Sequence, residues 1–122
     1  MSGEPTNSFS LAGRRVILTG AAGILGKAFA RALIDARASV LLVDRQESAL
    51  APILPDSGSL ADGQRAGMFA ADLANRDMDR AIIDKAAELF GAPADGLVNN
   101  AATKGGDLAA FFAPDESFSP DL

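Results

Sequence analysis

The feature that most constrains this chain is a short apolar run that breaks into three regularly spaced glycines. The run Val16-Ile17-Leu18 leads into Thr19-Gly20-Ala21-Ala22-Gly23-Ile24-Leu25-Gly26, after which apolar residues recur at helical spacing. This pattern predicts a strand, a tight turn and a helix. Gly20 can adopt the positive φ of a sharp turn, Gly23 allows a phosphate to approach the backbone, and Gly26 allows the helix to pack closely against the strand. A dinucleotide pyrophosphate would lie at the helix N-terminus, where backbone N–H groups are unpaired.

The helix after the turn is expected to run from about residue 24 to residue 36. Its core-facing stripe is predicted from helical spacing, and Lys27, Arg31 and Asp35 then fall on the opposite, solvated face. The predicted stripe consists of Leu25, Ala28, Phe29, Ala32, Leu33 and Ala36.

A second apolar run, residues 39–43, ends on Asp44. An acidic residue at the tip of the second strand suits the ribose of NAD, because a carboxylate accepts hydrogen bonds from ribose hydroxyls and repels a 2′-phosphate. Arg45 offsets that repulsion only in part, so the sequence predicts NAD, with NADP less favoured. The alternative is structural: Asp44 could cap the next helix, with Glu47 three residues later as in a capping box.

The remaining sequence continues to alternate between strands and helices. A short helix is expected within residues 46–54, a loop over 56–67, a third strand over 67–71 ending in Asp72-Leu73, a helix over 75–90 that stops at Gly91, and a fourth strand over 96–102. Such alternation predicts an α/β fold, a Rossmann-like doubly wound parallel sheet, here truncated after the fourth strand.

Composition narrows the possible functions. The 122 residues contain no Cys and no His, which excludes disulfides, Cys/His zinc sites and Ser-His-Asp hydrolysis in this chain. A net charge of -5 without a basic cluster argues against nucleic acid as a partner. No apolar run is long enough to span a membrane, and the first eight residues do not resemble a secretory signal, so a cytoplasmic location is expected. No metal site and no catalytic residue is predicted.

Four features together resemble the N-terminal half of the short-chain dehydrogenase/reductase family. They are the glycine turn 19–26, Asp44, the pair Asp72-Leu73, and the run Asn99-Asn100-Ala101-Ala102, which resembles the family's Asn-Asn-Ala-Gly element. The resemblance implies hydride transfer between a nicotinamide cofactor and a carbonyl or alcohol. The cofactor-binding residues that the turn, the strand tips and this resemblance indicate are Thr19, Gly20, Ala22, Gly23, Ile24, Leu25, Gly26, Asp44, Arg45, Asp72, Leu73, Asn99 and Ala101.

The resemblance also carries departures from the family pattern. Arg37 stands at the helix end where the family usually has Gly, and a left-handed backbone there would cost on the order of 1 kcal/mol. The family's catalytic Ser and Tyr-x-x-x-Lys have no counterpart in this sequence, which contains no Tyr. The expected organisation is a polar tail over residues 1–12, a dinucleotide-binding unit over 13–102, and a loop over 103–122 that leads into a missing helix.

Three interpretations of the sequence remain open. The first is the NAD-binding portion of an oxidoreductase that lacks its catalytic half, as in a truncated product or a fragment. The second is a dinucleotide-binding or regulatory module without chemistry. The third is a methyltransferase-like nucleotide fold, against which the Asn99-Asn100-Ala101 run argues. With strand order 3-2-1-4 the fourth strand becomes an open edge, so self-association is expected, while full-length relatives are expected to form homo-oligomers.

Overall fold

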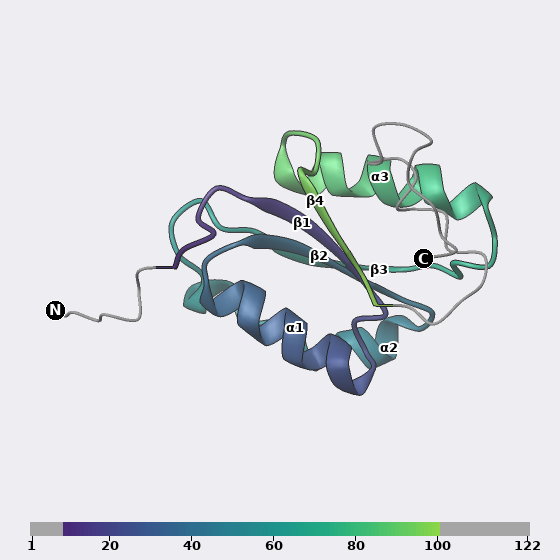
Figure 1. Ribbon diagram of the computed structural model, residues 1–122, viewed down its shortest axis with the longest axis horizontal. Coiled ribbons are helices and arrows are strands. Elements are labelled where there is room, and N and C mark those ends of the chain that lie inside the picture. Colours follow the sequence, from purple (N-terminus) through teal and green to yellow (C-terminus); the bar gives the residue numbers. More distant parts are fainter. Residues whose placement is uncertain (1–8, 101–122) are drawn as a thin grey trace, which may run out of the picture.

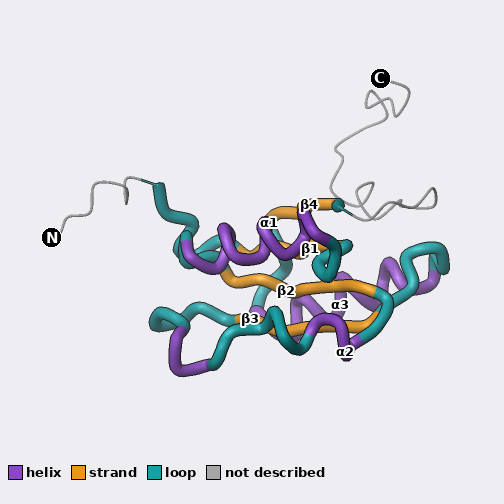
Figure 2. Tube along the Cα trace, turned by 90° about the horizontal axis from the view of Figure 1, so that it is seen from below, coloured by secondary structure: helices purple, strands orange, loops and turns teal. Residues whose placement is uncertain are grey.

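A parallel sheet of four strands forms the centre of the computed structural model, which describes residues 9–100. The strands are β1 (Arg15–Thr19), β2 (Ser39–Asp44), β3 (Ala66–Ala70) and β4 (Gly96–Asn99). Their order in space is β3-β2-β1-β4 (Figure 2), and every pairing is parallel. The predicted order 3-2-1-4 is therefore confirmed. Because parallel neighbours need a crossover connection, β1, β2 and β3 are each followed by a segment that returns over one face of the sheet.

Helices cover both faces of the sheet (Figure 1). Helices α1 (Ile24–Asp35) and α2 (Glu47–Leu50) lie on one face, and α3 (Asp77–Phe90) lies on the other. A single turn of 3-10 helix, Ser57–Ser59, interrupts the connection between α2 and β3. This α/β arrangement confirms the Rossmann-like fold class.

The core consists of two hydrophobic clusters, one on each face of the sheet. Alternate residues of β1 and β2 point to opposite faces, so Leu18 and Leu42 belong to the cluster beneath α1, whereas Ile17 and Leu41 belong to the cluster beneath α3. All four side chains are fully buried. Near-continuous burial of this kind is what a central parallel strand requires, because both of its faces are covered.

Two sequence predictions about helix faces have different outcomes. On α3 the helical spacing of Met78, Ile82, Ala86 and Leu89 predicts the core-facing stripe. This prediction is confirmed, because Ile82 and Ala86 are buried and the other two pack against the same cluster. On α1 the predicted stripe is wrong: Leu25 is 62% exposed and Phe29 is 41% exposed. The residues of that stripe that prove exposed are Leu25, Ala28, Phe29 and Ala32, whereas Leu33 and Ala36 are half-buried.

The physical reason is the close approach of α1 to the turn that precedes it. Its buried residues are Gly26 and Ala30, which lie one helical turn apart. A Cβ on Gly26 would lie 2.8 Å from Ala21 Cα, a distance that backbone atoms cannot accommodate. The helix therefore makes its closest approach through Gly26 and Ala30, so Leu25 and Phe29 are exposed and Leu33 is only partly buried against the cluster.

Most element boundaries lie within one or two residues of those predicted. The exceptions are α2, which is shorter than expected, and β4, which ends at Asn99. Ala101 and Ala102, together with the tail 1–8 and the segment 103–122, lie outside the described residues. Within residues 9–100, no helix is long and apolar enough to cross a membrane.

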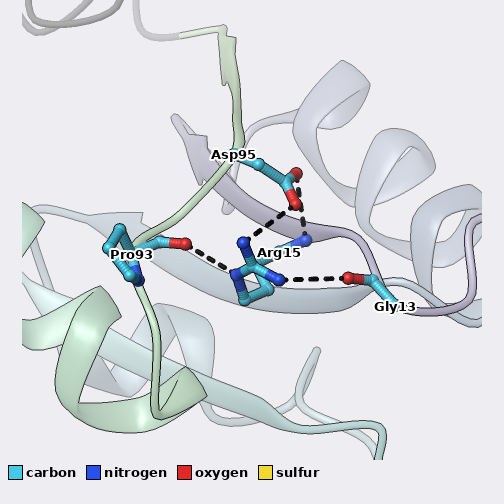
Figure 3. Close-up of polar contacts among 4 residues, drawn as sticks. All are labelled: Gly13, Arg15, Pro93 and Asp95. Carbon is cyan, nitrogen blue, oxygen red and sulfur yellow. Dashed lines mark hydrogen bonds and ion pairs between the residues drawn. The ribbon is translucent and has the colours of Figure 1, made fainter.

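A polar clamp joins β1 to the segment before β4 at the N-terminal edge of the sheet (Figure 3). Arg15 Nε donates to Pro93 O at 2.6 Å, and Arg15 Nη2 lies 3.5 Å from Asp95 Oδ2. The backbone N–H of Arg15 also donates to Asp95 Oδ1, while Arg15 Nη1 donates to Gly13 O. This clamp lies at the opposite end of the strands from the predicted site.

Candidate functional site

The predicted site residues gather where the parallel strands end. Because all four strands run in the same direction, Thr19, Asp44, Ala70 and Asn99 lie at one edge of the sheet. The residues that follow β1, β2 and β3 therefore lie close to one another at these strand ends. In open α/β sheets this carboxyl edge is where ligands bind.

The glycine turn has the geometry that its sequence predicts. Gly20 has a φ of 67°, a left-handed conformation that strongly favours glycine. The turn is closed by a hydrogen bond from Gly23 N–H to Gly20 O at 3.2 Å. Gly23 is exposed, and the nearest neighbour of a Cβ built on it is Gly20 O at 3.5 Å, an ordinary contact. Packing within the chain therefore demands glycine at position 26 but not at position 23.

The N-terminus of α1 is uncapped and faces the same edge. Gly23 is its N-cap residue and makes no side-chain cap, and the first intrahelical bond runs from Lys27 N–H to Gly23 O. Within residues 9–100, the N–H groups of Ile24, Leu25 and Gly26 have no acceptor. Such free N–H groups and the positive end of the helix dipole favour an anion.

Two apolar side chains stand exposed beside these N–H groups. Ile24 is 90% exposed and Leu25 is 62% exposed. Neither side chain belongs to the two hydrophobic clusters that form the core. Their position at the start of α1 would let them contact the apolar surface of a ligand whose anionic group lies at the helix end.

Asp44 holds the glycine turn and the tip of β2 together. Its Oδ2 accepts from the backbone N–H of Ala22 at 2.9 Å, and its Oδ1 accepts from the N–H of Arg45 at 2.7 Å. The capping alternative for Asp44 is wrong, because α2 begins at Glu47 with Gln46 as its N-cap residue and has no side-chain cap. The carboxylate therefore bonds to backbone N–H groups at the carboxyl ends of the strands and does not cap α2.

The other predicted residues near the second and third strands differ in exposure. Arg45 is exposed, and its side chain makes no hydrogen bond or ion pair within the described part of the chain. Asp72 is exposed, and its Oδ1 accepts from Ala74 N–H at 3.0 Å. Leu73 is 7% exposed and packs in the cluster beneath α3. The side chain of Leu73 therefore belongs mainly to the core.

The ends of β1 and β4 are joined by side chains. Thr19 is fully buried, and its Oγ1 donates to Asn99 Oδ1 at 2.8 Å. The backbone N–H of Asn100 donates to Thr19 O, and Asn100 Nδ2 donates to Gly20 O at 3.4 Å. The two asparagines therefore connect the fourth strand to the first strand and to its glycine turn. Ala101, the remaining predicted residue, is outside the described part.

A cleft of about 1140 Å³ lies elsewhere, between α1 and the connection from α2 to β3. Its lining includes Lys27, Arg31 and Arg37 on one side and Pro52 and Leu60 on the other. None of the predicted site residues lines it. The predicted site at the strand ends and this cleft are thus separate features.

Two hydrogen bonds at the carboxyl ends of the strands could not be predicted from the sequence. In one of them Ala22 N–H donates to Asp44 Oδ2, and in the other Asn100 Nδ2 donates to Gly20 O. The spacing of glycines signals a turn, but it carries no information on which side chain satisfies the N–H groups of that turn. Within the described residues, no group of three acidic, Cys or His side chains could hold a metal ion.

Comparisons with known proteins agree on the family. A family model described as short chain dehydrogenase matches residues 14–119. The chain is 39% identical over 106 residues to the short chain dehydrogenase/reductase dpchG of Colletotrichum higginsianum, a match that covers 84% of this chain and 37% of the relative. It thus spans little more than a third of that relative's length.

Solved structures lead to the same family. The crystal structure of hydroxysteroid dehydrogenase from Escherichia coli matches with a TM-score of 0.69 and 30% identity, covering 80% of this chain and 40% of that chain. The structure of L-sorbose reductase from Gluconobacter frateurii, in complex with NADPH and L-sorbose, matches with a TM-score of 0.65 and 31% identity. That match covers 78% of this chain and 35% of the reductase.

Proposed function

Because this chain belongs to the short-chain dehydrogenase family, we propose that its strand-end site binds NAD as part of an oxidoreductase that moves hydride between nicotinamide and a carbonyl or alcohol. The observation that carries the proposal is the meeting of Asp44 with the glycine turn, 2.9 Å from Ala22 N. This contact brings a carboxylate suited to ribose beside the uncapped N-terminus of α1, which suits a pyrophosphate.

The choice of NAD over NADP rests on charge. The family uses nicotinamide cofactors, and solved structures of this fold hold NAD in one case and NADPH in another. At the proposed ribose position Asp44 presents a carboxylate, against which a 2′-phosphate would be repelled. Arg45, exposed and adjacent, offsets only part of that repulsion.

NAD would be held by residues from all four strand ends. The free N–H groups of Ile24, Leu25 and Gly26 would bind the pyrophosphate, and Asp44 the adenosine ribose. Asp72 would border the adenine, while Asn99 would lie beside the second ribose. The bound cofactor supplies or accepts the hydride. The residues named above would bind and orient the cofactor.

Titration of the 122-residue chain with each cofactor tests the proposal. We expect NADH to bind more tightly than NADPH, and Asp44→Ala to weaken NADH binding by about tenfold or more, because hydrogen bonds to a charged group contribute roughly 1.5–3 kcal/mol. The chain contains no Trp and no Tyr, so NADH fluorescence can be followed without overlapping protein emission. Asp62→Ala is the matched control, since Asp62 is an exposed carboxylate outside the site. Equal or tighter NADPH binding would assign cofactor choice to Arg45.

Turnover is a separate expectation. Reduction of a carbonyl needs a proton donor beside the developing alkoxide, and this sequence contains no Tyr and no His. We therefore expect the 122-residue chain to bind NAD and to leave ketones, aldehydes and secondary alcohols unchanged. NADH absorbance with a panel of such compounds is the assay. Reproducible turnover that disappears in Asp44→Ala would contradict the expectation.

A further inference from the structure

The carboxylate of Asp44 makes two hydrogen bonds within the chain itself. Both of its oxygens accept backbone N–H groups, one from Ala22 in the glycine turn and one from Arg45. The backbone carbonyl of Asp44 accepts a third, from Ala71 at the end of β3. One residue thus connects the glycine turn, the start of the β2–α2 connection and the end of the third strand.

The backbone N–H of Ala22 bonds to a side chain, whereas the N–H groups of its two neighbours bond to backbone carbonyls. Ala21 N–H donates to Val43 O at 3.1 Å, and Gly23 N–H donates to Gly20 O. Within the described residues, the only acceptor for Ala22 N–H is the side chain of Asp44. Ala22 is half-buried, so loss of that acceptor would leave an N–H group only partly able to reach water.

We propose that Asp44 is a positioning residue that sets the conformation of the glycine turn before any cofactor arrives, in addition to recognising ribose. The second role rests on the function proposed above, whereas the first does not. A carboxylate has about four acceptor sites, of which two are used here, so about two remain for the two hydroxyls of a ribose. The turn bond can therefore persist when NAD binds, and binding needs little rearrangement.

Backbone hydrogen exchange in the cofactor-free, isotope-labelled chain tests the positioning role. Asp44→Ala removes the acceptor, so the exchange rate of the Ala22 amide should rise about tenfold or more relative to that of Leu41 in β2. Asp44→Asn keeps one carbonyl oxygen able to accept from Ala22, and should leave that ratio within about threefold of the native chain. Glu47→Ala is the matched control, because Glu47 is an exposed carboxylate three residues away with no bond to the turn, and it should change neither amide.

Cofactor titration of the same variants separates the two roles. Asp44→Asn should keep NAD affinity within about threefold and lose most of the discrimination against NADP, whereas Asp44→Ala should weaken NAD binding by about tenfold or more. An Ala22 amide that exchanges no faster in Asp44→Ala than in the native chain would overturn the positioning role. An Ala22 amide that exchanges as fast in Asp44→Asn as in Asp44→Ala would also overturn it. Failure of all chains to bind cofactor, with the exchange result as expected, would instead overturn only the proposed function.

Discussion

At the scale of single residues, Arg37 carries a backbone conformation that suits glycine. It follows the end of α1 with a φ of 79°, and within residues 9–100 it is the one non-glycine residue with a positive φ. The side chain is exposed and makes no hydrogen bond or ion pair in the described part of the chain that would offset the strain. The left-handed backbone that makes a non-glycine residue costly at this position is thus present, and no described contact of the Arg37 side chain offsets that cost.

We expect Arg37→Gly to raise the free energy of unfolding by about 1 kcal/mol, because glycine adopts a positive φ without a steric penalty. Urea unfolding followed by far-UV circular dichroism measures the effect, since the chain has no Trp or Tyr to report by fluorescence. The matched control is Ala36→Gly at the preceding position, where φ is -83°, and this change should be destabilising. Arg37→Gly without any gain would mean that Arg37 relaxes at little cost.

At the scale of elements, the end of α1 is held by a glutamine from a distant loop. Gln64 Nε2 donates to Ile34 O at 3.0 Å and to Ala38 O at 2.8 Å, while its Oε1 accepts from Ala61 N–H. The carbonyl of Ile34 also accepts from Arg37 N–H at 2.9 Å at the end of the helix, so Gln64 supplies its second hydrogen bond. Gln64 thus caps α1 from outside and fixes the loop that leads into β3.

Gln64→Ala should lower the free energy of unfolding by about 1–3 kcal/mol, because it leaves the carbonyl of the buried Ala38 and the N–H of the half-buried Ala61 without these partners. Gln64→Glu should cost at least as much, since a carboxylate would face the two carbonyl oxygens that now accept from Nε2. Gln46→Ala is the matched control: Gln46 is exposed and makes no side-chain cap on α2, so its loss should change stability by less than about 0.5 kcal/mol. Equal effects at positions 64 and 46 would show that the capping bonds contribute little.

The sequence predicts an element well where a continuous apolar run marks a strand that is buried on both faces, or where regularly spaced glycines mark a turn. The runs around Ile17 and Leu41 identify the central strands, and the glycine spacing identifies the turn. It fails on the face of α1, because Gly26 and Ala30 carry almost no hydrophobic signal although they make the closest contact. It also cannot pair residues distant in sequence, such as Asp44 with Ala22 or Arg15 with Asp95, because such partners depend on the completed sheet.

At the scale of the whole molecule, β3 and β4 are the two edge strands of the described sheet, and β4 is the edge that the sequence predicts to be open. β4 pairs with β1 on one side, and within residues 9–100 no strand pairs with its other side. Its residues are only half-buried or exposed, in contrast to the fully buried centre of β2. Unpaired N–H and C=O groups along such an edge are a template for another strand.

We expect the 122-residue chain to self-associate through this edge, so that its sedimentation coefficient rises with concentration and its thermal transition depends on concentration. Gly96→Lys adds a charge on the edge strand, where a Cβ has room because the nearest atom, Val16 Cγ2, lies 3.7 Å away. Lysine is a residue that natural edge strands use against pairing, so this variant should shift the chain towards monomer. Gly58→Lys makes the same change in net charge on the 3-10 helix, where nothing lies within 4 Å of a Cβ, and should not affect association. A monodisperse native monomer with a sharp, concentration-independent transition would contradict the expectation and would show that the edge of β4 is covered within the same chain.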